Sequence, residues 1–321
     1  MPLKLLLLMN MTVILLFGLL FGLLAAVGFY FNISTIFMVI FAFVLVFIQW
    51  MVGPSIIWMT SNMREIGKNE YSWIWEAVRE YSKKHEVPMP KKIALARSGA
   101  PNAFVFGRTP GSATLAVTQG LLNTLSREEA KAVIGHEMGH IKHKDMVVMT
   151  FASVVPLIAY YVFIGLVYGR GDGDRRSAGA AILIGIGAYL VYIISNLLVL
   201  ALSRYREYYA DDFGGRVSKP SVLASALTKI TYGLSVNKKE ASRDALRSFY
   251  IADPITSSME ISKFSSEYSD LHISDKEIKS AMEWEKKNLW VRISEVFRTH
   301  PLTFKRVNAL MQLEKELSRQ K

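Results

Sequence analysis

The pattern of apolar positions along the 321-residue chain is dominated by four runs in which almost every residue is hydrophobic. About 20 apolar residues in a helix are enough to cross the ~30 Å hydrocarbon core of a bilayer. The runs cover residues 5–26, 33–53, 146–168 and 178–202, and no acid, Lys or Arg interrupts any of them. The pattern predicts a mainly α-helical membrane protein with four transmembrane helices.

The first run resembles a secretory signal only in its position. Its apolar core is about twice the usual ~7–15 residues, and a second span follows almost at once, so we expect it to be retained. All but a few of the 38 Lys and Arg residues lie in segments 60–145 and 203–321. Basic segments near span ends stay in the cytoplasm. The three Arg residues in loop 169–177 weaken this orientation slightly.

This interpretation divides the chain into four consecutive parts. A transmembrane hairpin of residues 1–59 precedes a cytoplasmic part, 60–145. A second hairpin, 146–202, leads into a second, helical cytoplasmic part, 203–321.

The first polar part contains patterns for a helix and a small sheet. Apolar residues recur at helical spacing over residues 69–86, before Pro88 and Pro90. Segments 91–99, 102–107 and 112–120 read as short strands separated by Gly and Pro turns. We therefore predict a small β-sheet ahead of the next helix, in an α+β arrangement.

That next helix has a clear start signal. Ser126 and Glu129 have the spacing of a capping box, in which each side chain binds the backbone amide of the other residue. The helix is predicted from Arg127 toward Lys144, and we expect it to continue into the third span or to bend only slightly.

The same helix carries a pattern of metal ligands. His136 and His140 are four residues apart, so both imidazoles lie on one helical face and can bind one ion. Glu137 stands beside the first histidine, where a carboxylate can deprotonate a metal-bound water. This is the H-E-x-x-H pattern of zinc metalloproteases. The alternative is an amphipathic helix with ordinary surface histidines.

A catalytic zinc site of this kind takes a third protein ligand from elsewhere. His143 shares the helical face, but it lies about 10.5 Å along the axis from His136, too far for one tetrahedral ion. We interpret it as a surface or interface histidine. His85, His272 and His300 remain open as ligands.

Membrane geometry favours a carboxylate as the third ligand. His140 lies about 9 Å before the third span and Glu207 about 7.5 Å after the fourth, so antiparallel spans bring them to similar heights. Asp211 shares a helical face with Glu207 and can accept the free N–H of a ligand histidine. The alternative is an acidic pair bound to Arg204 and Arg206.

Composition narrows the class of protein further. Half of the residues are hydrophobic, and the net charge is +11. The basic residues alternate with acids along amphipathic segments, which fits a solvated face beside an anionic membrane better than a nucleic-acid site. The chain has no Cys, which excludes disulfides, a thiolate nucleophile and Cys-type zinc sites.

Four stretches together resemble a known family. They are "PNAFVFG" at 101–107, "TLAVTQGLLNTLSREEAKAVIGHEMGHIKHKD" at 114–145, "SRYREYYAD" at 203–211 and "THPLTFKRVNAL" at 299–310. Their sequence is similar to the HtpX family of membrane zinc metallopeptidases, which are relatives of the CAAX prenyl proteases. The resemblance is close over residues 96–213, and residues 257–290 match no pattern that we recognise.

The resemblance implies a role for individual residues. It places one zinc ion on His136, His140 and Glu207, the general base on Glu137 and the orienting acid on Asp211. It also implies a zincin-like protease domain on the cytoplasmic side of a multi-pass cell-membrane protein.

The resemblance further implies residues near the substrate. In the family the Asn-Ala-Phe segment is an edge strand beside the active site, which places Asn102, Ala103 and Phe104 next to a bound peptide. The His-Pro motif falls on His300, with Arg306 six residues on, and we expect both to assist the substrate or transition state. The alternative is a helix start followed by a surface arginine.

These observations predict a zinc-dependent endopeptidase that acts near the bilayer. The resemblance further implies that it cleaves misfolded membrane proteins or unfolded polypeptides, in quality control and stress response. One alternative is a prenyl-protein protease of the CAAX type, although such enzymes usually have more spans. Another is a metal-binding scaffold or transporter, but transporters usually need ionisable residues inside the spans. We expect no nucleic-acid partner.

Overall fold

The computed structural model describes residues 3–32, 35–168, 175–236 and 282–320. The chain forms two compact units. The first comprises Met1–Gly53 with Val147–Tyr205, and the second comprises Pro54–Met146 with Arg206–Lys321.

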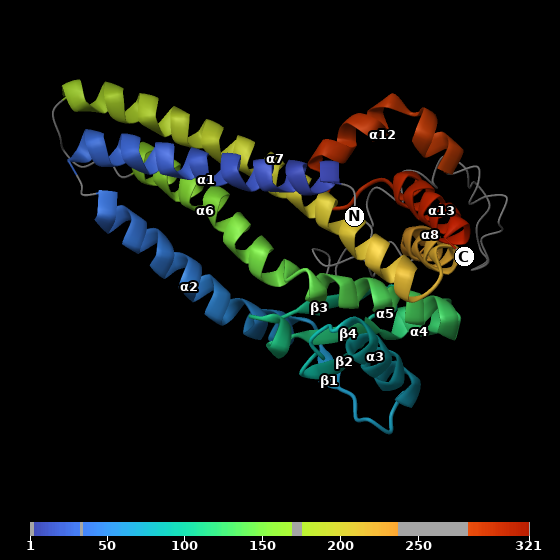
Figure 1. Ribbon diagram of the computed structural model, residues 1–321. Helices are drawn as coiled ribbons and strands as arrows, with labels where there is room; N and C mark the ends of the chain where they lie inside the picture. Colours follow the sequence, from blue (N-terminus) through green and yellow to red (C-terminus); the bar gives the residue numbers. More distant parts are fainter. Residues whose placement is uncertain (1–2, 33–34, 169–174, 237–281, 321) are drawn as a thin grey trace. The chain divides into compact units, whose positions relative to one another are not determined.

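The first unit is built from four long helices (Figure 1). They belong to α1 (Leu3–Phe31), α2 (Thr35–Thr60), α6 (Asp145–Tyr168) and α7 (Arg175–Val217). All four are long and apolar enough to cross a membrane, which confirms the four predicted spans. Leu16 of α1 packs against Ala152 and Val155 of α6, while residues such as Phe21 and Leu183 point outward. Outward apolar side chains are expected where the surrounding solvent is lipid.

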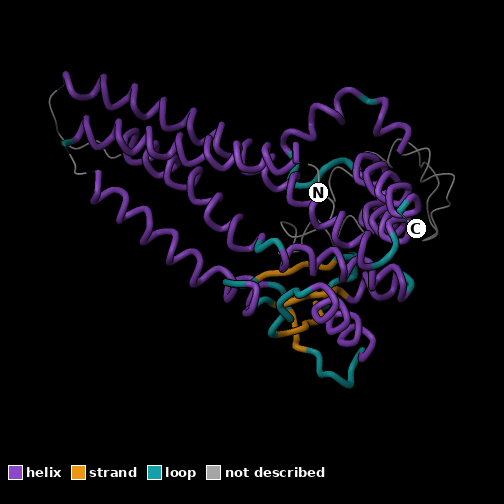
Figure 2. Tube along the Cα trace, viewed as in Figure 1, coloured by secondary structure: helices purple, strands orange, loops and turns teal. Residues whose placement is uncertain are grey.

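The second unit contains a four-stranded sheet, drawn in orange in Figure 2. Its strands are β1 (Met63–Glu65), β2 (Lys92–Ala96), β3 (Ala103–Phe106) and β4 (Thr114–Thr118), in the order β1-β2-β4-β3. β2 and β4 are parallel, and the two outer pairs are antiparallel. The small sheet that the sequence predicts is confirmed, and the three-residue β1 is an addition to it.

The two faces of this sheet pack against different partners. On one face, residues such as Leu95, Leu115 and Val117 join the main core with the helices of the second unit. On the other face, Ala116 and Phe106 pack with residues of the last turns of α2. This alternation follows from the two-residue period of strands.

The main core unites the sheet with six helices. Their bounds are α3 (Ser72–His85), α4 (Gln119–Thr124), α5 (Arg127–Lys142), the end of α7, α8 (Pro220–Val236) and α13 (Thr303–Arg319). The described part also contains the short helical segments η1 (Pro110–Ser112), α12 (Leu289–Ser294) and η3 (Glu295–Phe297).

The junction after α5 differs from our expectation of a nearly continuous helix. α5 ends at Lys142, and α6 begins at Asp145 after Lys144, which adopts a left-handed conformation with φ of 59°. Arg206 Nη2 donates to the His143 carbonyl oxygen at 2.6 Å and so satisfies one of the carbonyls exposed at the helix end. The break gives Asp145 a direction that a continuous helix would not allow.

Candidate active site

The helix that bears the two histidines is anchored at its start. Ser126 and Glu129 form the predicted capping box, with the Glu129 carboxylate accepting from the Ser126 amide at 2.9 Å. The same carboxylate accepts from the Ser225 hydroxyl at 2.7 Å and pairs with Lys229 at 2.6 Å, both on α8. The cap therefore also fixes α5 against a neighbouring helix.

Small residues let α5 and the end of α7 approach closely. A Cβ atom on Gly139 would lie 3.0 Å from the Ala210 Cα atom, and one on Gly214 would lie 2.9 Å from the His136 Cα atom. Only glycine fits such contacts without a shift of backbone. This close packing brings Glu207, about two turns before Gly214, within reach of the histidines of α5.

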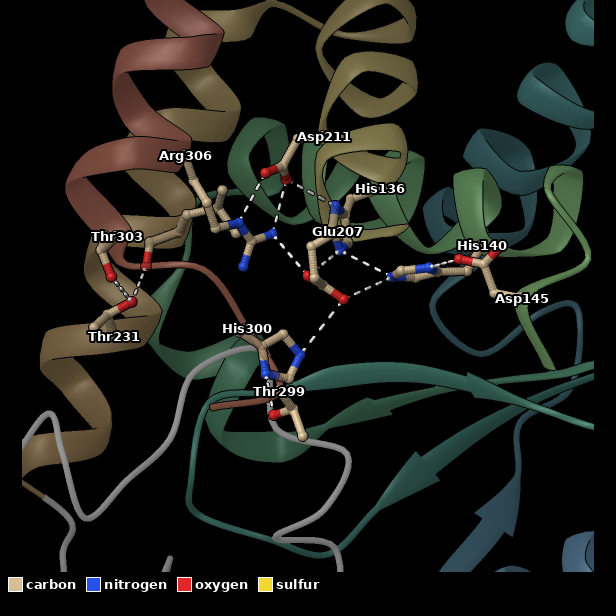
Figure 3. Close-up of polar contacts among 11 residues, drawn as sticks. His136, His140, Asp145, Glu207, Asp211, Thr231, Thr299, His300, Thr303 and Arg306 are labelled. Carbon is tan, nitrogen blue, oxygen red and sulfur yellow. Dashed lines mark hydrogen bonds and ion pairs between the residues drawn. The ribbon is translucent and has the colours of Figure 1, made fainter. Parts of the chain in front are cut away.

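Three side chains converge between these helices (Figure 3). His136, His140 and Glu207 each offer a ligand atom, and these atoms all lie within 4.8 Å of one another. The two Nε2 atoms are 3.2 Å apart, and the Glu207 oxygens lie 3.6 Å from His136 Nε2 and 3.5 Å from His140 Nε2.

These separations fit a tetrahedral ion. Ligand atoms at about 2.0–2.1 Å from zinc are separated from one another by about 3.3–3.4 Å along the edges of the tetrahedron. Two imidazoles and one carboxylate are also a donor set of catalytic zinc sites, which leave the fourth position open. The sequence-predicted ligand set is therefore brought together with a geometry that can hold zinc.

Asp211 supports the first histidine. Its Oδ1 atom lies 3.0 Å from His136 Nδ1, on the side of the ring opposite the converging Nε2 atom. Arg306 donates from Nε and Nη2 to the two Asp211 oxygens, each at 2.8 Å, and its Nη2 lies 3.2 Å from Glu207 Oε2. A carboxylate held in this way fixes the ring orientation of a ligand histidine.

Asp145 supports the second histidine in the same manner, and the sequence did not single it out. Its Oδ2 atom lies 2.6 Å from His140 Nδ1, and its carboxylate pairs with Arg206. Arg206 is 4% exposed and Asp145 is 7% exposed. Each histidine thus has one acid behind it and one arginine behind the acid. The only signal in the sequence was an acid just beyond the H-E-x-x-H pattern.

Glu137 is enclosed beside the ligands. Glu137 is only 3% exposed, and this burial raises the pKa of its carboxyl group above the usual value. A carboxylate with a raised pKa is a stronger base toward a nearby water.

His300 and Arg306, two of the residues predicted to lie near the substrate, contact the acids of the ligand cluster. His300 Nε2 lies 3.5 Å from Glu207 Oε1, and its Nδ1 contacts the Thr299 hydroxyl at 2.8 Å. Figure 3 places His300 and Asp211 on opposite sides of Glu207. Arg306 is 3% exposed and bound to two carboxylates, so it is not the surface arginine of the alternative interpretation. Its guanidinium is directed at the ligand framework.

The Asn-Ala-Phe segment lies at the edge of the sheet. Asn102 exchanges hydrogen bonds with Thr118, through its amide at 2.8 Å and its carbonyl at 2.9 Å. Ala103 begins β3, which is an outer strand of the sheet within the described part of the chain and packs against α5. The Phe104 side chain lies on the opposite face of the sheet from the main core.

His143 and His85 are not members of the described ligand cluster, and each packs against an aromatic ring. The His143 ring lies 5.4 Å from the Tyr209 ring, and the His85 ring lies 5.6 Å from the Phe213 ring. Burial lowers the pKa of His143 to about 4, so it is neutral near pH 7. His272 falls outside the described residues. The alternative for the two acids was a salt-bridged pair with Arg204 and Arg206. Instead, Glu207 and Asp211 pair with Arg306, and Arg206 pairs with Asp145.

Comparison with known proteins identifies the family of the chain. Residues 68–314 match Peptidase family M48. The chain therefore belongs to peptidase family M48 and is a metalloprotease. Among its relatives, it is 40% identical over 237 residues to "Protease HtpX homolog" of Methanothermobacter thermautotrophicus, a match that covers 72% of this chain and 88% of the relative.

Two further comparisons extend over almost the whole chain. "Protease HtpX homolog" of Methanocaldococcus jannaschii is 29% identical over 314 residues, covering 95% of this chain and 97% of the relative. The crystal structure of S. mikatae Ste24p is similar in fold, with a TM-score of 0.52 and 15% identity, covering 96% of this chain and 67% of that chain. The resemblance to HtpX proteases is confirmed, and the fold is shared with Ste24p.

Proposed function

We propose that this metalloprotease is a zinc-dependent endopeptidase of membrane-associated polypeptides, with zinc on His136, His140 and Glu207. The observation that carries the proposal is the convergence of these ligand atoms within 4.8 Å, next to the enclosed carboxylate of Glu137. Asp211 and Asp145 orient the two imidazoles from behind.

Peptide hydrolysis assigns each group a task. Zinc, when bound, supplies an acidified water and a Lewis acid for the scissile carbonyl. Glu137 accepts the proton of the attacking water and passes it to the leaving amine. We assign to His300, whose Nε2 atom lies 3.5 Å from Glu207, the donation of a hydrogen bond to the oxygen on which negative charge develops. Arg306 acts as a positioning residue for Asp211 and Glu207.

The edge strand supports binding of an extended substrate. In an antiparallel pair, residues alternate between pairs bonded to the partner strand and pairs whose main-chain groups point away. Thr118 donates to the Asn102 carbonyl, so the alternation directs the main-chain groups of Ala103 and Val105 outward. A peptide can add to these groups as a further strand, largely independent of its sequence. Such binding suits a protease that acts on many unfolded polypeptides.

Membrane placement forms the second half of the proposal. We propose hairpins of residues 1–59 and 146–202, with the protease part in 60–145 and 203–321 on the cytoplasmic side. The four apolar helices and the concentration of Lys and Arg outside them support this orientation. A site near the bilayer surface suits loops of misfolded membrane proteins, and therefore proteolytic quality control.

Glu137→Gln tests the chemistry. The variant should retain one zinc ion per chain but lose cleavage of an unfolded membrane protein in reconstituted vesicles, with His143→Gln as a control that keeps activity. Cleavage by Glu137→Gln at the wild-type rate would refute its role. Zinc binding by the wild type without any hydrolysis would instead favour a metal-binding scaffold.

Orientation has a separate test, because the chain contains no Cys. A single Cys at Lys83, on the exposed surface of α3, should react with a membrane-impermeant maleimide only after the cells are opened. Labelling of intact cells would place the protease part on the outer side.

A further inference from the structure

A cavity of about 410 Å³ lies on the face of the sheet that does not contribute to the main core. It is formed where the last turns of α2 cover one end of the sheet, within the second unit. Its lining residues are Pro54, Ser55, Trp58, Met59, Lys91, Lys92, Phe106, Gly107, Arg108, Ser112 and Thr114.

The strand register explains why these residues meet. Lys92 of β2 pairs with Thr114 of β4, which pairs with Phe106 of β3, so the three form one row across the sheet. Their side chains share the face that carries Ala94 and Ala116, because alternate strand residues point to the same side. Trp58 of α2 packs against this face and closes one side of the cavity.

The chemistry of the lining is cationic and hydroxylic. Lys91, Lys92 and Arg108 contribute positive charge, and none of the described lining residues is acidic. Lys92 Nζ pairs with Glu65 at 3.0 Å and lies 5.0 Å from the centre of the Trp58 ring, so it is held at the wall. The described lining residues thus include three basic side chains and no acidic one, a composition that favours an anion.

The position of the cavity at the end of α2 indicates which kind of anion it binds. The apolar stretch that can cross a membrane continues from Ile40 to Thr60, so the α2 side of the cavity belongs to its final turns. Met59 is 81% exposed and Ile56 is 54% exposed, which gives the same turns an outward apolar surface. Trp at a span end and basic residues just beyond it are typical of the level of lipid headgroups.

We propose that this cavity binds the headgroup of an anionic phospholipid, with its acyl chains along the outer surface of α2. Lys91 and Arg108 contact the phosphate, while Ser112 and Thr114 offer hydroxyl groups to the phosphate or glycerol oxygens. A free phosphate ion would use the same charges, but it would gain nothing from the apolar turns of α2. The bound lipid links the end of the second span to the sheet whose opposite face supports the metal-binding helix.

Native mass spectrometry of the full chain in a neutral detergent tests this proposal. Added phosphatidylglycerol should remain bound as one lipid per chain, and phosphatidylcholine should not. Lys91→Gln with Arg108→Gln should weaken retention about five-fold for each charge removed. The matched control, Lys83→Gln with Lys84→Gln, removes the same charge from the exposed surface of α3 and should retain the lipid.

Three results would overturn the proposal. They are equal retention of the two lipids by the wild type, unchanged retention by the cavity variant, and displacement of the lipid by millimolar inorganic phosphate. The wild-type comparison needs no variant, so it decides the matter even if the double variant fails to fold. Zinc content, measured on each variant, shows whether the second unit is intact and is independent of proteolytic activity.

Discussion

Gly214→Ala should weaken zinc binding, although Gly214 is not a ligand. It lies in α7, the helix that carries the ligand Glu207. The added Cβ atom would lie 2.9 Å from both the Cα and the backbone N of His136. Neither atom belongs to a flexible side chain, so the contact is relieved only if α5 and the end of α7 move apart. Because His136 belongs to α5 and Glu207 to α7, the distance between these two ligands increases when the helices move apart.

The size of the effect follows from the contact distance. Relief of the contact from 2.9 Å to the 3.4 Å at which ordinary van der Waals contact begins requires a shift of 0.5 Å. Metal–ligand distances tolerate only about 0.2 Å. The metal-free variant can relax, but zinc binding must draw the helices together again against an overpacking strain of about 1–3 kcal/mol. Zinc affinity should therefore fall by about 5- to 150-fold.

Competition with a chromophoric chelator measures this affinity on the detergent-solubilised protein. Gly187→Ala is the matched control, because it is the same substitution in the same helix and its Cβ atom meets nothing within 4 Å. Alanine at such a helical position should be neutral or stabilising by about 0.5–1 kcal/mol. Zinc affinity of Gly214→Ala within about twofold of the wild type would refute the argument from close helix packing.

Three other changes test different parts of the protease unit. Asp145→Asn should lower zinc affinity by about 10- to 100-fold because it weakens the support behind His140, and wild-type affinity in the same chelator assay would remove Asp145 from the site. Glu129→Gln should lower the free energy of unfolding by about 1–2 kcal/mol near pH 7. Burial favours the protonated acid, but Lys229 and the capping hydrogen bonds outweigh it and lower the pKa of Glu129. Its stabilising effect is therefore complete above the unfolded-state pKa and disappears as the pH falls through the lower folded-state value, so a difference in thermal unfolding that persisted in acid would contradict this assignment. Val105→Pro removes one outward amide of the edge strand and should reduce kcat/KM for a polypeptide about tenfold at unchanged zinc content, whereas unchanged kinetics would exclude strand addition at this edge.

Elements that depend on neighbouring residues in the sequence were predicted from local patterns. The four spans follow from uninterrupted apolar runs, and the start of α5 follows from the spacing of Ser126 and Glu129. Glu207 was reached by a longer argument, from the antiparallel return of the fourth span. Its placement near the histidines depends on residues such as Gly139 and Gly214, whose role is visible only when the two helices are packed.

Asp211 was predicted from its spacing to Glu207, but the acid that contacts His140 and the arginines that pair with both acids depend on tertiary contacts that the sequence does not show. Asp145 faces His140 only because the helix breaks at Lys144, and the break is stabilised by Arg206 from a distant part of the chain. Arg306 looks like a surface charge on an amphipathic helix, although it is buried against two carboxylates. Strand β1 has only three residues, too few for a periodic pattern to identify it.

The two-faced sheet makes a prediction about genetics as well as structure. Along β4, Leu115 and Val117 face the core beneath the metal-binding helix, whereas Thr114 and Ala116 face the end of α2. A saturation screen of this strand should therefore separate two phenotypes. Substitutions at the buried Leu115 and Val117 should reduce folding and proteolysis in any membrane, whereas substitutions at Thr114, which lines the cavity, should make activity depend on lipid composition.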